Sequence, residues 1–127
     1  IAVSLTSFEG QNFATAGRVA RELVERFVRK PIWDPILLNV NVPDIPYSEL
    51  QGFEVTRLGR RHKAEPVVKT VSPRNETLYW IGAAGAAADA GPGTDFKATE
   101  RRCVSITPLQ IDLTHNAQMS SIAQWME

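Results

Sequence analysis

The feature that most constrains this chain is a strand–helix–strand pattern in residues 1–42. Residues 1–5 (I-A-V-S-L) form an apolar run, and residues 36–42 form a second one that Pro43 ends. Between them, apolar residues recur in steps of three and four over residues 13–27, which is the spacing of one helix face. This pattern predicts two parallel strands joined by a right-handed helical crossover.

The ends of the predicted helix carry recognisable signals. Thr6, Ser7 and Asn12 precede its first turn and are candidate N-terminal caps. Arg29 and Lys30 suit the negative end of the helix dipole, and Pro31 stops the helix.

The first predicted strand is almost entirely apolar, which is typical of a strand buried on both faces. Two parallel strands are not stable by themselves and need further strands beside them and cover on both sides. We therefore expect this chain to be the latter part of a larger sheet, with residues 1–50 forming the end of an α/β core.

Residues 51–127 follow a different pattern. Residues 53–58 and 104–109 are predicted strands, and residues 66–72 and 77–82 flank a turn as in a hairpin. Residues 83–93 are nearly all Ala and Gly, which predicts a mobile loop, and Thr94 and Asp95 can cap a helical turn that runs to Glu100. A short helix is predicted over residues 116–126. Because isolated helices of this length are not stable in water, its apolar side must pack against another part of the protein or a partner.

Composition excludes several classes of protein. Lys plus Arg number 14, as do Asp plus Glu, so the formal net charge is zero. We therefore do not expect the domain as a whole to bind nucleic acid or anionic lipid through its charge. Cys103 is the sole cysteine, and His62 and His115 occur in no metal-binding motif. No apolar run reaches the roughly 18 residues of a membrane span. The expectation is a cytoplasmic α/β domain without membrane or specific nucleic-acid partners.

Two short stretches are candidates for ligand contact. Asn39 and Asn41 share one face of a strand near its carboxyl end, where they either border a ligand crevice or bond to neighbouring backbone. Gly93, Thr94 and Asp95 lead into a helix start, which either attracts an anion or is capped internally.

A basic segment, residues 57–63 (R-L-G-R-R-H-K), follows the predicted strand at residue 53. It fits either a phosphate or nucleic-acid patch or a solvated loop, and the neutral total charge favours the loop. No acidic pair, metal-ligand cluster or nucleophile motif occurs in the sequence, so no catalytic or metal-binding residue is predicted in this chain.

Five segments together resemble the SurE (survival protein E) family of 5'/3'-nucleotidases. They are L-N-V-N-V-P (38–43), V-T-R-L-G (55–59), Y-W-I-G (79–82), G-P-G-T-D-F (91–96) and V-S-I-T-P-L (104–109). The resemblance covers the whole chain but only about the second half of a family member. It implies the C-terminal portion of a Rossmann-type, three-layer fold with a βαβ unit, an extended hairpin and a C-terminal helix.

The resemblance also implies a function. Family members remove the phosphate from nucleoside monophosphates with Mg²⁺ or Mn²⁺, held by an N-D-D-G motif, a Ser, and an Asn in an S-G-x-N segment. Neither motif occurs here, so the chain alone is expected to be inactive. Residues Asn39, Asn41, Gly93, Thr94 and Asp95 are expected to border the substrate pocket.

The family resemblance further implies assembly into a homodimer or homotetramer. The hairpin and the C-terminal helix, within residues 51–127, are the expected contacts, through Tyr79, Trp80, Ile122 and Trp125. Two alternatives to the enzyme remain: a non-catalytic assembly module built on these elements, and a small ligand-binding protein. The family commonly has Gly and an aromatic residue where this chain has Arg102 and Cys103, so the turn there is expected to differ.

Overall fold

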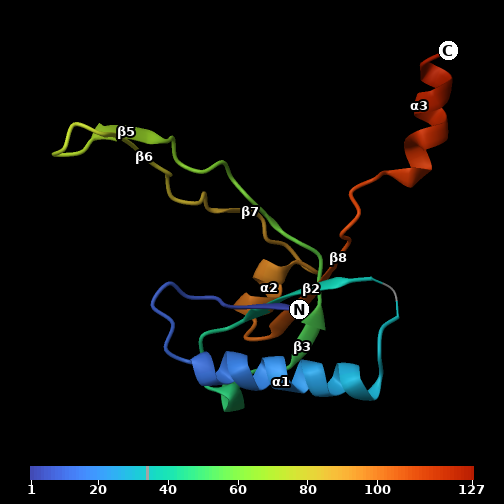
Figure 1. Cartoon of the computed structure of the whole chain (residues 1–127). Helices are drawn as coiled ribbons and strands as arrows, with labels where there is room; N and C mark the ends of the chain where they lie inside the picture. Colours follow the sequence, from blue (N-terminus) through green and yellow to red (C-terminus); the bar gives the residue numbers. More distant parts are fainter. Residues whose placement is uncertain (34) are drawn as a thin grey trace.

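A mixed four-stranded sheet organises the protein, as seen in a computed structural model that describes residues 1–33 and 35–127 (Figure 1). The strands lie in the order β1-β2-β8-β3. Strands β1 and β2 are parallel, as predicted, whereas β8 runs antiparallel to β2 and parallel to β3. Their bounds are Ala2–Leu5 for β1, Leu37–Val42 for β2, Val104–Leu109 for β8 and Phe53–Val55 for β3. The chain itself therefore supplies two of the additional strands that the β1–β2 pair needs.

The sheet has one apolar face and one polar face. Val3, Val40 and Ile106 align across β1, β2 and β8 on one face, whereas Asn41 is paired with Ser105 on the other. Because side chains alternate along a strand, the Asn, Ser and Thr residues all fall on the second face. The prediction that residues 1–5 are buried on both faces is wrong, because Ala2 and Ser4 are exposed on the polar side of an edge strand.

Helix α1 (Phe13–Arg29) covers the apolar face, and Lys30 is its C-terminal cap, just before the predicted stop at Pro31. Its Val19 and Leu23 pack with Val40, Val42 and Val104 in the buried core. Other apolar residues of the predicted helix face stay exposed: Phe13, Val24 and Phe27.

A residue far away in the sequence holds the start of α1. Asn12 occupies the cap position, but its side chain makes no capping hydrogen bond to the helix. The Asp44 carboxylate, which follows β2, accepts hydrogen bonds from the backbone N–H groups of Asn12 (2.8 Å) and Gln11 (3.1 Å). These hydrogen bonds hold the pKa of Asp44 below its ordinary value. One carboxylate thus ties the helix start to the end of the neighbouring strand.

On the polar side lies the short helix α2 (Asp95–Glu100), with Thr94 as its cap. After α2 the chain turns into β8 through Arg102, whose φ of 60° lies in the left-handed region. The backbone N–H of Cys103 closes this turn on the Ala98 carbonyl (2.9 Å). The left-handed turn that glycine usually supplies at a helix end is therefore made by an arginine. An ion pair between Arg102 and Glu49 (3.2 Å) accompanies it.

An extended arm leaves the sheet after β3. Strands β5 (Val68–Val71) and β6 (Thr77–Trp80) form the predicted antiparallel hairpin, which Figure 1 shows projecting far from the sheet. At its base, β4 (Arg60–Arg61) pairs with β7 (Ala87–Asp89). The prediction of a mobile loop over residues 83–93 is therefore wrong in part, because small side chains do not prevent backbone pairing in a two-stranded ribbon. The strand predicted at residues 53–58 ends early, at Val55.

The C-terminal segment also stands away from the sheet (Figure 1). The predicted helix over residues 116–126 is a single-turn 3₁₀ helix, η2 (Asn116–Gln118), followed by α3 (Met119–Trp125). A further 3₁₀ turn, η1 (Tyr47–Glu49), follows β2. None of the helices in the described part of the chain is both long and apolar enough to cross a membrane.

The capping role of Asp44 predicts a pH-dependent loss of stability in the Asp44→Asn variant. A carboxylate whose pKa is lowered by folding stabilises the folded state above its unfolded pKa, and that contribution disappears as pH falls through the lower folded value. We expect the variant to melt at a lower temperature than the wild type at pH 7. Below the ordinary aspartate pKa of 3.8 the difference should shrink.

Thermal unfolding of both proteins, followed by circular dichroism between neutral and acidic pH, measures this difference. A gap in melting temperature that stays constant across the whole pH range would show that the charge of Asp44 contributes nothing.

Candidate functional site

A polar cavity of about 200 Å³ lies on the polar side of the sheet. Residues from four parts of the chain line it: Thr6, Asn41, Arg61, Asp95, Phe96 and Thr99. Thr6 directly follows β1, and Asn41 is next to the last residue of β2. The cavity is therefore at the carboxyl ends of the two parallel strands, where open α/β sheets bind their ligands.

Asn41 contributes an amide to this cavity. Its Nδ2 donates a hydrogen bond to the Ser105 hydroxyl on β8 (3.3 Å), which orients the side chain. Asn39 shares the same strand face and is paired with Thr107, but it does not line the cavity. Of the two asparagines, Asn41 therefore lines the cavity, whereas Asn39 lies further along the sheet.

Asp95 connects α2 to the segment that follows β3. Its Oδ1 accepts hydrogen bonds from the backbone N–H of Gly59 (2.8 Å) and from that of Phe96 (3.0 Å). The backbone N–H of Asp95 in turn donates to the Arg57 carbonyl (3.1 Å). Asp95 therefore lines the cavity and also fixes the position of the chain that leads to Arg61.

Thr94 and Gly93 form the helix cap and do not line the cavity. The buried Thr94 hydroxyl accepts a hydrogen bond from the Lys97 N–H (3.2 Å) and donates one to the Gly91 carbonyl (2.7 Å). Gly93 has a φ of +80°, and its carbonyl accepts the Arg57 N–H (3.0 Å). Of the two interpretations of this stretch, the internal cap is the one that the hydrogen bonds support.

The basic segment does not act as one patch. Arg57 forms a bidentate ion pair with Asp89, in which Nη1 donates to Oδ2 (2.6 Å) and Nη2 donates to Oδ1 (3.0 Å). This pair lowers the pKa of Asp89 and raises that of Arg57. Arg61 instead places its guanidinium 4.9 Å from the centre of the Phe96 ring and donates to the Gly85 carbonyl (3.1 Å). One cation is thus neutralised within the fold, whereas Arg61 lines the cavity.

Sequence reasoning missed four of the six cavity residues: Thr6, Arg61, Phe96 and Thr99. One signal was available, because Thr99 is four residues after Asp95 and so shares its helix face. What the sequence could not provide is the approach of β4 to α2.

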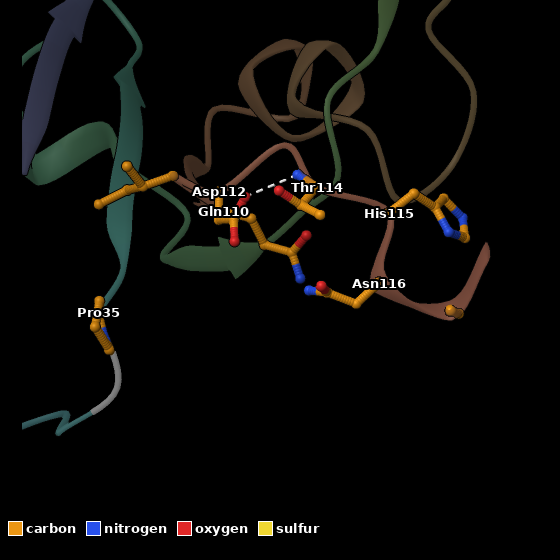
Figure 2. A pocket seen from close by; sticks show the side chains of 8 residues that line it. Pro35, Gln110, Asp112, Thr114, His115 and Asn116 are labelled. Atoms are coloured by element: carbon orange, nitrogen blue, oxygen red, sulfur yellow. Dashed lines mark hydrogen bonds between the residues drawn. The ribbon is translucent and has the colours of Figure 1, made fainter. Parts of the chain in front are cut away.

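A larger hollow of about 670 Å³ lies where the chain leaves β8 for α3 (Figure 2). It is bordered by Pro35, residues 110–112 and residues 114–117. Asp112 accepts a hydrogen bond from the Thr114 backbone N–H (2.8 Å), which closes a local turn, and bonds to Thr114 lower the pKa of Asp112. Figure 2 shows the His115 ring pointing away from Asp112. These groups do not converge on a common point, so we do not treat the hollow as a reaction site.

The structure also tests whether these residues suit a divalent cation. In residues 1–33 and 35–127, no cluster of three or more His, Cys, Asp or Glu side chains could hold a metal ion. The cavity offers one carboxylate, from Asp95, and its Oδ1 already accepts two backbone hydrogen bonds. Divalent ions such as Mg²⁺ require several converging oxygen ligands. The described residues thus do not fit a complete metal site.

Comparison with known proteins gives a consistent result. The family model described as "Survival protein SurE" matches residues 1–65. The chain is 61% identical over 126 residues to the 5'-nucleotidase SurE of Nitrosomonas eutropha and 62% identical to that of Nitrosomonas europaea. Each alignment covers 99% of this chain and 51% of the relative. The chain thus spans about half the length of the curated relatives it matches.

A solved structure shares the fold. The crystal structure of the SurE protein from Aquifex aeolicus superposes with a TM-score of 0.76 at 35% sequence identity, covering 99% of this chain and 51% of that one. The predicted α/β architecture is therefore confirmed.

The assignment of Thr94 as a cap predicts a structural cost when its hydroxyl is removed. In the Thr94→Ala variant, the Lys97 N–H loses its partner, and the loss of a threonine cap costs about 1–2 kcal/mol. Urea unfolding measures the free energy, and Thr94→Ser, which keeps the hydroxyl, is the matched control. An alanine variant as stable as the serine variant would contradict the assignment.

Proposed function

This chain belongs to the SurE family, and we propose that it is part of a 5'-nucleotidase that hydrolyses the phosphate monoester of nucleoside 5'- or 3'-monophosphates. The observation that carries the proposal is the 61–62% identity to curated 5'-nucleotidases across 99% of the chain. The polar cavity at the carboxyl ends of β1 and β2 supports it, because this is where an α/β enzyme binds its substrate.

The proposed part of this chain in the reaction is substrate binding. Asn41 and Asp95 border the cavity and offer an amide and a carboxylate to a polar ligand. Of the five residues predicted to border the substrate pocket, Asn41 and Asp95 line this cavity, and we propose that these two contact the substrate. Asn39, Gly93 and Thr94 support the surrounding structure.

We propose that the complete enzyme requires Mg²⁺ or Mn²⁺, held by residues outside this chain. The described residues contain no group of side chains that could hold a divalent ion, which supports ligands from outside this chain. A cytoplasmic location is part of the same proposal. Cys103 is free and buried, as is usual in a compartment that keeps thiols reduced.

A role in assembly is the second proposed function, and the exposure of two projecting elements favours it. Tyr79 and Trp80 on the hairpin are 65% and 62% exposed, and Ile122 and Trp125 on α3 are 55% and 78% exposed. Aromatic anchors of this kind are the typical centres of protein interfaces. We propose that the hairpin and α3 join subunits in a homodimer or homotetramer.

Nucleotidase activity should require the complete protein. The purified 127-residue chain should release no phosphate from adenosine 5'-monophosphate, with or without Mg²⁺ or Mn²⁺, because its described residues form no complete metal site. The complete protein should release phosphate and lose this activity when the metal is chelated. A phosphate-release assay measures both, and metal-dependent turnover by the chain alone would contradict the proposal.

Assembly should depend on the apolar side chains of α3. Trp125→Ala in the complete protein should shift the dimer or tetramer towards monomer, because it removes a large apolar contact. Light scattering measures the mass in solution. Trp33→Ala is a matched control, since Trp33 is 89% exposed but lies on neither projecting element. A wild-type protein that is strictly monomeric would exclude this role.

A further inference from the structure

The Arg61–Phe96 pair is the part of the cavity that the proposed hydrolysis does not explain. We propose that the Arg61 guanidinium, supported by the Phe96 ring, is the platform on which the nucleobase of the substrate stacks. This inference rests on the proposed function and extends it from the phosphate to the other end of the nucleotide.

Several contacts hold the platform in place. The guanidinium carbon of Arg61 lies over the Phe96 ring, 4.9 Å from its centre, and Nη1 donates to the Gly85 carbonyl at 3.1 Å. The Phe96 ring packs closely on Gly59, where a β-carbon would overlap the ring. The Phe96 ring therefore contacts both the Gly59 backbone and the Arg61 guanidinium. Arg61 is exposed, so a ligand can reach its guanidinium.

A planar guanidinium is a known stacking surface for bases, because its flat, delocalised charge lies parallel to the π-face of the base. Contact with an aromatic ring beneath it orients the group and reduces the entropy lost on binding. Because every base has a π-face, such a platform accepts different nucleosides.

The surroundings favour a base over the phosphate. The Asp95 carboxylate lines the same cavity and would repel a phosphate dianion. The Asn41 amide offers both a donor and an acceptor, which suits the polar edge of a base. At about 200 Å³, the cavity is smaller than the roughly 300 Å³ typical of complete ligand sites, so it fits one part of a nucleotide.

The neighbouring arginine provides a matched control. Arg60 belongs to the same two-residue strand, β4, but does not line the cavity. Arg60→Lys keeps the charge of β4 and makes the same chemical change as Arg61→Lys, but at a residue that does not line the cavity.

The experiment compares two phosphate monoesters in the complete enzyme: adenosine 5'-monophosphate and ribose 5-phosphate, which has no base. Arg61→Lys keeps the charge but loses the planar surface, and Phe96→Leu removes the support. We expect each variant to raise KM for the nucleotide about tenfold, within the range for loss of one stacked base, and to leave KM for ribose 5-phosphate unchanged. Arg60→Lys should change neither value.

Binding of adenosine, measured by titration calorimetry, gives a second readout that requires no turnover. Arg61→Lys should weaken it about tenfold. Equal increases in KM for both substrates would assign Arg61 to the phosphate and overturn the proposal, as would unchanged KM values and unchanged adenosine binding. A wild-type enzyme that binds adenosine but hydrolyses neither ester would refute the proposed function and leave the stacking platform standing.

Discussion

The structure depends on the alternation of apolar and polar side chains along β1, β2 and β8. On one face, Val40 and Val104 pack with Val19 of α1 in the only cluster of buried apolar residues that the described chain contains. On the other face, Asn41 and Ser105 are hydrogen-bonded to each other. In such a sheet, stability comes from the burial of apolar side chains on one face. The polar face can then keep groups that would be costly in a core.

The second half of the chain completes the site by returning to that polar face. Asp95 holds Gly59, and the Arg57–Asp89 ion pair joins the segment after β3 to the end of β7. These contacts bring Arg61 and Phe96 beside Asn41, although the residues are far apart in sequence. The hairpin and α3, in contrast, extend away from the sheet (Figure 1), so the site and the proposed assembly surfaces occupy separate parts of the molecule.

The sequence predicted local structure well because periodicity and capping signals are local. The α1 helix, the parallel β1–β2 pair, the β5–β6 hairpin and the Thr94 cap are all confirmed. It failed where an outcome depends on distant partners. The capping of α1 by Asp44 and the pairing of β4 with β7 required knowledge of which segments meet. For the same reason Arg61 was not predicted as a cavity residue, because its place there depends on the approach of β4 to α2. The family resemblance is confirmed, and the metal, nucleotide and subunit contacts remain predictions.

The central claim is that the polar face of the sheet binds part of the substrate. A crystal structure of the complete protein with a bound nucleoside monophosphate tests it most directly. The nucleotide should lie against Asn41 and Asp95, with its base on Arg61. A nucleotide bound elsewhere, for example in the hollow between β8 and α3, would contradict the claim.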